Sequence, residues 1–146
     1  MRISFFVGLL FVLGTCWNTT LFAQTETEPA TVGFVGSLSE ATAVAKEKEM
    51  NFFIVVWEDD QNPAYLNTIS LLNDSSVIQA FDGKILPLIA HSSSDNGLNM
   101  QKQFDLSEFP AALFVSIEGE ELYTLENPEK LEADQLIDLY ERFVIP

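Results

Sequence analysis

The feature that most constrains the fold of this chain is a run of six apolar residues at positions 52–57, FFIVVW. Most of them are β-branched or aromatic, which is typical of a strand buried on both faces in the middle of a mixed sheet. A polar loop follows, and Pro63 suits the first turn of a helix, where a missing N–H costs no hydrogen bond. In open α/β sheets the loop after such a strand is a usual place for binding and chemistry.

The first 23 residues have the pattern of a secretory signal peptide. Arg2 gives a basic start, residues 3–13 are apolar, and Ala23 is a small residue at the expected cleavage point. Because the apolar run is shorter than the ~20 residues of a membrane-spanning helix, we expect an exported protein, periplasmic or extracellular, with no stable membrane insertion after cleavage. An uncleaved anchor and lipid attachment through Cys16 are the alternatives.

Cys16 is the only cysteine, so cleavage after Ala23 would leave a mature chain without a thiol. Such a chain could form no disulfide, use no cysteine nucleophile and bind no metal through sulfur. His91 is the only histidine, which excludes a metal site built on a histidine pair. We therefore expect neither a metal nor another cofactor.

The chain is strongly acidic, with a formal net charge of −15. The leader holds one of the seven basic residues and no acidic residue, so the rest of the chain has 6 basic against 22 acidic residues, a charge of −16. That field would repel nucleic acid and an anionic membrane surface. A solvated acidic surface is the simplest interpretation, although a basic partner is also favoured.

Residues 24–31 are polar, contain Pro29, and predict a short linker before one domain over residues 32–146. The hydrophobic pattern and the capping signals predict the order β-α-β-α-β-α-β-β-α, an α/β fold. We expect strands at 32–35, 52–57, 84–90, 111–116 and 121–125. Helices are expected from Ser37 or Ser39 to Lys48, at 63–72 with a short second helix after residues 73–75, at 98–104, and at 131–144.

This order, with Phe109-Pro110 before the final hairpin, resembles the thioredoxin fold over residues 32–144. The sequence NDSSVI at 73–78 is similar to the start of the helix that follows the active-site helix in exported thioredoxin-like proteins. The sequence FPAALF at 109–114 resembles the family segment in which a cis proline precedes an apolar strand, and the UAS domain is similar at both places. The resemblance implies a three-layer α/β/α sandwich around a central mixed β-sheet, with Pro110 in cis.

The resemblance also places the family's Cys-x-x-Cys motif on four residues of this chain. Gln61 and Ala64 stand where the two cysteines would be, and Pro63 is kept. The family's buried Asp falls on Val55, and the aromatic residue four positions before the first cysteine is retained as Trp57. Since a thiolate attack needs a thiol, the resemblance implies the fold without its exchange chemistry.

In resembling proteins an extended substrate strand pairs beside the cis proline. We therefore expect a redox-inactive binding or adaptor module, not an enzyme of its own, that holds a protein or an extended peptide segment. The residues implied for this site are Trp57, Gln61, Asn62, Pro63, Ala64, Phe109 and Pro110. Trp57, Tyr65 and Phe109 could either line an apolar groove there or pack in the core.

Other interpretations stay open at this point. The chain could be an oxidoreductase component that acts through a partner's cysteines, or a structural part of an envelope assembly. A hydrolytic site at His91, with the neighbouring serines and Asp95, would need a geometry that residues of one loop rarely have. Residues 58–60 are all acidic and could bind Ca²⁺, but their spacing fits no EF-hand, and a solvated turn is the simpler interpretation. The sequence gives no indication of the oligomeric state.

Overall fold

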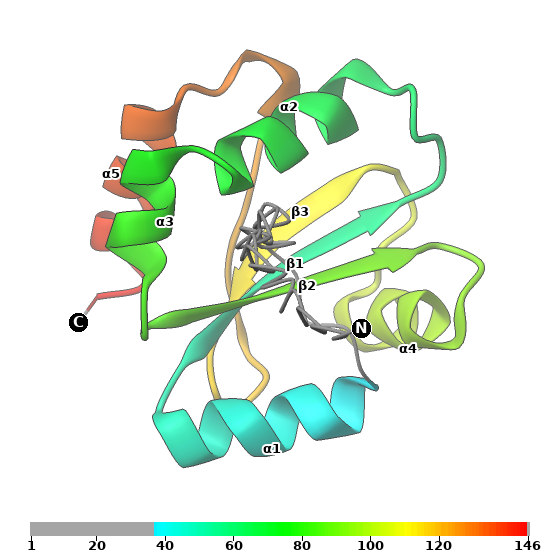
Figure 1. Cartoon of the computed structure of the whole chain (residues 1–146). Helices are drawn as coiled ribbons and strands as arrows, with labels where there is room; N and C mark the ends of the chain where they lie inside the picture. The colour runs from blue at the N-terminus through cyan, green and yellow to red at the C-terminus, as the bar shows by residue number, and fades with distance from the viewer. Residues whose placement is uncertain (1–36, 146) are drawn as a thin grey trace, which may run out of the picture. The chain divides into compact units, whose positions relative to one another are not determined.

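The computed structural model describes residues 37–145 of the chain (Figure 1). The predicted signal peptide, the linker and the strand at 32–35 lie outside the described residues. In chain order the elements are α1 (Leu38–Lys48), β1 (Asn51–Trp57), α2 (Pro63–Leu72), α3 (Ser75–Phe81), β2 (Ile85–His91), α4 (Asp95–Phe104), β3 (Ala111–Val115), β4 (Glu121–Thr124), the 3₁₀ helix η1 (Pro128–Lys130) and α5 (Ala133–Phe143).

The four strands form one mixed sheet in the order β2-β1-β3-β4. Strand β1 runs parallel to β2 and antiparallel to β3, with Val55 opposite Ile89 on one side and Ala112 on the other. Strands β3 and β4 are antiparallel. Helices α2, α3 and α5 lie on one face of the sheet, and α1 and α4 lie on the other (Figure 1). The predicted three-layer α/β/α sandwich is confirmed.

Strand β1 is buried on both faces, as its sequence predicts. Residues Phe52 to Val56 are each at most 4% exposed. Because successive side chains of a strand point to opposite faces, Phe53 and Val55 enter the core beneath α2, α3 and α5. Phe52 and Ile54 enter the core beneath α1 and α4. One short stretch of sequence therefore supplies the centre of both hydrophobic layers.

Side-chain caps start the helices that frame the sheet. Ser37 caps α1 in a capping box with Glu40, in which each side chain accepts a hydrogen bond from the other residue's backbone N–H. Asn62 caps α2, and Pro63 is its first residue, as predicted. Asp74 caps α3 by accepting from the backbone N–H groups of Ser76 and Val77. These caps satisfy N–H groups that have no partner inside a helix.

Helix α4 begins at Asp95, three residues earlier than its sequence pattern predicts. Ser94 is the cap, and its hydroxyl oxygen accepts from the backbone N–H of Gly97 at 3.1 Å. Gly97 is thus a residue of the first helical turn and not of the preceding loop. A Cβ at this position would clash with the His91 carbonyl oxygen, so glycine allows α4 to pack against the end of β2.

The last helix begins at Ala133, two residues later than predicted. Leu131 and Glu132 have extended backbones, and Glu132 forms a capping box with Gln135. The segment before them forms η1, which the hydrophobic pattern does not predict. This short helix packs against α2, and it lines the groove described below.

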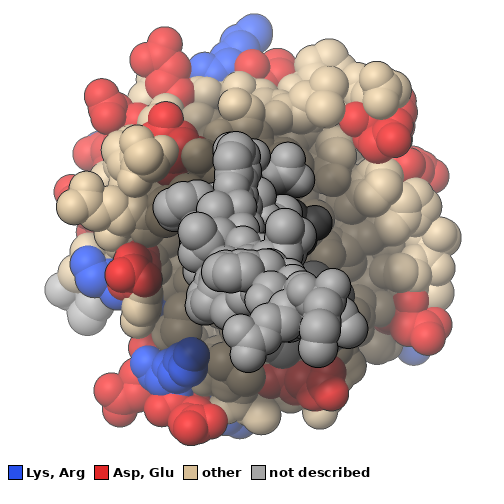
Figure 2. All heavy atoms as spheres, in the orientation of Figure 1, with Lys and Arg blue, Asp and Glu red and all other residues tan. Residues whose placement is uncertain are grey.

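The surface of the described residues is acidic and contains few ion pairs. Acidic groups are spread around the face shown in Figure 2, with only a few basic groups among them. Within residues 37–145, Arg142 and Asp138 form the only ion pair, at 2.6 Å. Both side chains are exposed, so the pair contributes little to stability. Among these residues, no helix is long and apolar enough to cross a membrane.

Because Asp74 caps α3 through its carboxylate, we expect the free energy of unfolding to depend on the protonation of this group. Hydrogen bonds from the Ser76 hydroxyl and the Ser76 N–H hold the pKa of Asp74 below its usual value. A lowered folded-state pKa means that the stabilisation is complete above the unfolded pKa of ~3.9 and is lost as the pH falls through the folded value. Asp74→Asn keeps a capping oxygen but removes this titration. The difference in unfolding free energy between the native protein and this variant should be constant above pH 5 and should change below pH 4.

Urea unfolding between pH 7 and pH 2.5, together with an NMR titration of the Asp74 carboxyl, measures this effect. Asp82→Asn is the matched control because Asp82 is exposed at the other end of α3 and its carboxylate makes no hydrogen bond to a described residue. An Asp74 midpoint at or above ~3.9 would contradict the expectation.

Candidate functional site

A groove of about 390 Å³ lies where the first turn of α2, the segment before β3 and the η1 region meet. Five of the seven residues that the resemblance implies for binding line this groove. They come from two segments that are more than forty residues apart in the sequence. The lining residues are Asn62, Pro63, Ala64, Glu108, Phe109, Pro110, Asn127, Pro128 and Glu129.

The first wall is the start of α2, where the resemblance places the Cys-x-x-Cys motif of the family. The Asn62 side-chain oxygen accepts from the backbone N–H of Ala64 at 2.9 Å. Its own backbone N–H donates to the Asp59 carbonyl oxygen at 3.2 Å. Asn62 therefore fixes both the loop and the first helical turn. Pro63 is exposed and Ala64 is half-buried, so this wall presents a small and largely apolar surface.

The second wall is the segment before β3. The Phe109-Pro110 peptide bond is cis, as the resemblance implies. Backbone pairing between β1 and β3 ends at Val56 and Ala111. Phe109 lies beyond that last pair, and no other described residue forms a hydrogen bond to its backbone. Its N–H and C=O thus have no hydrogen-bond partner among the described residues, while its side chain packs against the core beneath α1 and α4.

The third wall is η1, and it is tied to α2 by one side chain. The Asn67 Nδ2 group donates to the Pro128 carbonyl oxygen at 2.7 Å and to the Leu131 carbonyl oxygen at 2.9 Å. Asn127, which precedes η1, has a left-handed backbone with φ of 48°, a conformation that asparagine tolerates better than most residues. These interactions place Pro128 and Glu129 opposite the start of α2.

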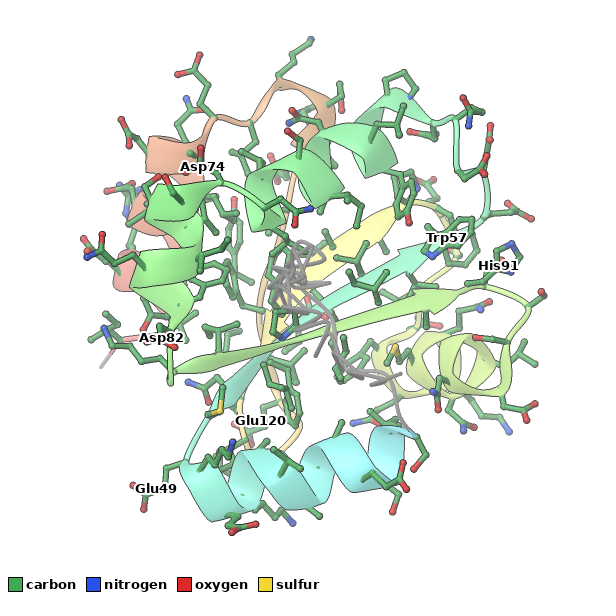
Figure 3. The ribbon with its side chains drawn as sticks, in the orientation of Figure 1. Glu49, Trp57, Asp74, Asp82, His91 and Glu120 are labelled. Atoms are coloured by element: carbon green, nitrogen blue, oxygen red, sulfur yellow. The ribbon has the colours of Figure 1, made fainter. Side chains whose placement is uncertain are left out.

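Two of the implied residues, Trp57 and Gln61, lie close to the groove in sequence but do not line it. Trp57 stacks on Tyr65 with ring centres 4.8 Å apart and meets the edge of His91 at 4.6 Å (Figure 3). Gln61 is exposed, and its amide donates to an Asp60 carboxylate oxygen at 3.1 Å. Burial raises the pKa of Tyr65 above its usual value, and the charge of Asp60 adds to the effect. Tyr65 also packs against the core beneath α2, which is the second of its two predicted roles.

His91 joins the ends of β1 and β2. Its Nδ1 accepts the backbone N–H of Ser93 at 3.1 Å, so the ring proton is on Nε2, which lies 3.2 Å from the Glu58 carbonyl oxygen and donates to it. The Ser93 hydroxyl is also 2.8 Å from Nδ1. The Asp95 carboxylate is not among the partners of the ring, so these residues form no Ser-His-Asp arrangement. Within residues 37–145, no group of three or more acidic, His or Cys side chains is arranged to hold a metal ion.

Sequence reasoning missed four groove residues and the residue that positions them. Glu108, Asn127, Pro128 and Glu129 line the groove, and Asn67 holds the η1 region in place. The Asn127-Pro128 pair does favour a turn, and that signal could have indicated a break before α5. Nothing in the local sequence shows that this turn packs on α2, because the contact joins residues more than sixty positions apart.

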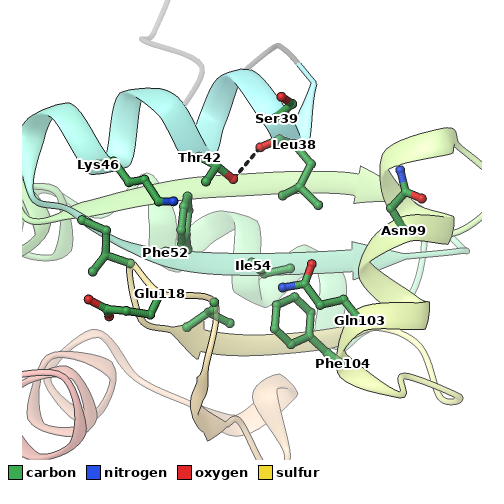
Figure 4. Close-up of a pocket in the computed structure, with 13 residues that line it drawn as sticks. Leu38, Ser39, Thr42, Lys46, Phe52, Ile54, Asn99, Gln103, Phe104 and Glu118 are labelled. Carbon is green, nitrogen blue, oxygen red and sulfur yellow. Dashed lines mark hydrogen bonds between the residues drawn. The ribbon is translucent and has the colours of Figure 1, made fainter.

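A second groove, of about 440 Å³, lies on the face of the sheet that α1 and α4 cover (Figure 4). Its floor includes the buried residues Phe52, Ile54 and Val115, and Lys46 and Glu118 are charged residues of its lining. None of the implied site residues lines it. The Thr42 hydroxyl on its α1 side donates to the Leu38 carbonyl oxygen within the helix.

Comparison with known proteins gives matches among solved structures alone, because no family model and no curated protein matches the chain. A proposed disulphide-isomerase from Bacteroides thetaiotaomicron superposes with a TM-score of 0.60 at 20% identity, over 79% of this chain and 96% of the other. A thioredoxin from Thermus thermophilus gives 0.61 at 13% identity, over 75% and 85%. The reduced C-terminal domain of DsbD from Neisseria meningitidis gives 0.57 at 19% identity, over 72% and 91%.

These similarities show the fold of the chain and nothing finer, because all three identities are low. The chain has the thioredoxin-like fold, and its sequence lacks the Cys-x-x-Cys motif. The predicted fold family is confirmed.

The contact between Asn67 and η1 can be tested by mutation. Asn67→Ala removes two hydrogen bonds and should lower the free energy of unfolding by about 1–2 kcal/mol. Asn67→Asp should cost more, because it would place a carboxylate beside two carbonyl oxygens. Amide hydrogen exchange of residues 127–131 should become faster in both variants. Asn99→Ala on exposed α4 is the control and should stay within about 0.5 kcal/mol. Unchanged exchange at 127–131 in both Asn67 variants would contradict this role.

Proposed function

We propose that this thioredoxin-like protein is a redox-inactive binding module that holds an extended segment of a partner protein in the groove beside Pro110. The observation that carries the proposal is the unpaired backbone of Phe109, a residue that lines the groove and whose N–H and C=O have no hydrogen-bond partner among the described residues. Such a pair of groups is what an added strand needs in order to extend a sheet by main-chain hydrogen bonds.

The shape of the groove supports an extended ligand. Alternate side chains of a bound strand would point to opposite sides, with one set facing the groove and the other facing solvent. Pro63 and Pro128 belong to two of the walls and have no N–H of their own, so they cannot compete with Phe109 as donors to the backbone of the ligand. Ala64 leaves room between them.

The same positions lack what disulfide exchange requires. Gln61 and Ala64 occupy the places that cysteines hold in redox-active members of this fold, and Val55, which replaces the buried Asp, is fully buried among apolar side chains. Exchange needs a thiolate that attacks a disulfide sulfur. The proposal therefore assigns binding without exchange, in a protein exported by its N-terminal leader to the periplasm or the extracellular space.

Blocking the groove should abolish binding. Ala64→Gln adds a long uncharged side chain at the groove and keeps a residue that suits a helix. Fluorescence anisotropy with a library of capped seven-residue peptides identifies those that bind the native protein, and the variant should bind them at least about tenfold more weakly. NMR shift changes should cluster at residues 62–64, 108–110 and 127–129.

The matched control is Ala43→Gln, the same substitution on the exposed side of α1, across the sheet from the groove. It should leave peptide affinity unchanged. Equal affinity of the Ala64→Gln variant and the native protein, with both shown to be folded, would place binding elsewhere and overturn the proposal.

The redox part of the proposal has its own test. In an insulin reduction assay with dithiothreitol, the purified mature chain should add nothing to the rate seen with dithiothreitol alone, because it supplies no thiolate. Restoring cysteines with Gln61→Cys and Ala64→Cys serves as the positive comparison. Turnover by the cysteine-free chain would refute the assignment.

A further inference from the structure

We infer that the groove beside Pro110 selects extended segments that carry a Lys or Arg side chain. This inference rests on the proposed function and adds the chemical class of the partner. It depends on the two acidic residues in the groove walls, on the absence of Lys, Arg and His from the described lining, and on the prolines that have no backbone N–H.

Two acidic residues line the groove from different segments. Glu108 belongs to the segment before β3, and Glu129 belongs to η1; both are exposed and both line the groove. No Lys, Arg or His is among the described residues that line it. A cationic side chain placed between the two walls would therefore meet negative charge on both sides.

These carboxylates are not neutralised by the protein itself. The ion pair between Arg142 and Asp138 is the only one within residues 37–145, so neither Glu108 nor Glu129 has a described cation at ion-pair distance. Lys130 follows Glu129 in the sequence, but it is exposed and does not line the groove. Their charge is thus available to a ligand.

The uncharged part of the lining also disfavours an anionic ligand. Three of its residues, Pro63, Pro110 and Pro128, have no backbone N–H to donate. The N–H of Ala64 is already used by the Asn62 side chain. The lining still contains the Asn62 and Asn127 amides and the Phe109 N–H, but an acidic ligand side chain would also meet two like charges, whereas an ammonium or guanidinium group needs only acceptors.

The overall negative charge of the protein would attract any basic peptide weakly, so the test must separate local from global charge. The probes are three capped peptides of sequence Thr-Val-Thr-X-Thr-Val-Thr, with X as Lys, Gln or Glu. Glu108→Gln with Glu129→Gln removes the two groove charges. Glu47→Gln with Glu141→Gln removes two exposed charges from α1 and α5 and changes the net charge by the same amount.

We expect the Lys peptide to bind about three- to tenfold tighter than the Gln peptide, because each exposed ion pair is worth roughly 1.5- to 5-fold in affinity. The Glu peptide should bind more weakly than both. The Glu108/Glu129 variant should bring the Lys and Gln peptides within twofold of each other, and the Glu47/Glu141 control should keep most of the preference. Raising the salt from 20 to 500 mM should weaken the preference, because exposed charges are screened.

Equal binding of the Lys and Gln peptides by the native protein would overturn the charge selectivity while leaving the peptide-binding function intact. Equal loss of preference in the two double variants would overturn it as well, because net charge would then be the cause. Failure of all three peptides and of the unbiased library to bind would overturn the proposed function, and the inference with it.

Discussion

The structure depends on the burial of β1 from both sides. Its residues alternate between two hydrophobic layers, so Phe53 packs in one layer and its neighbour Phe52 packs in the other. The neighbouring elements are positioned by this strand. Strands β2 and β3 pair with its two edges, and α2 starts from the loop at its end. A strand that is apolar on both faces must be covered by helices on both sides, which leaves the strand ends as the places where polar groups can gather.

One strand end carries the groove, and the three walls of the groove come from segments that are distant in the chain. The α2 wall follows β1 directly in the chain. The Phe109-Pro110 wall lies beside it because β3 pairs with β1 in an antiparallel arrangement. The η1 wall packs on α2, and Asn67 donates the two side-chain hydrogen bonds that join them. The proposed function centres on this groove and not on a reactive group, because Gln61 and Ala64 stand where the resemblance places the two cysteines of the family.

The fold could be predicted from the sequence because the strongest signals in the sequence are local. The apolar run at 52–57, Pro63 at the start of α2, and the Asn73-Asp74 break each reflect short-range physics, and each was observed where expected. The groove was predicted only in part. Glu108 and Glu129 have no local pattern that marks them as neighbours. Trp57 lies outside the groove, stacked on Tyr65 and in a T-shaped contact with His91, and no local pattern indicates these tertiary contacts. The predicted start of α4 was three residues too late, because Gly97 belongs to the first turn of the helix, where the absence of a side chain allows its close approach to His91.

The Asn67 hydrogen bonds have a consequence for how fast a ligand could be captured. Because α2 forms one wall directly and holds the opposite wall through Asn67, the width of the groove is set before anything binds. A ligand then loses its own conformational freedom on binding but need not order the walls. In the proposed function, a groove whose walls are already joined would require no slow closing step, so the association rate would be governed by diffusion and orientation, and differences in affinity between partners would be expressed mainly in how long each one stays bound.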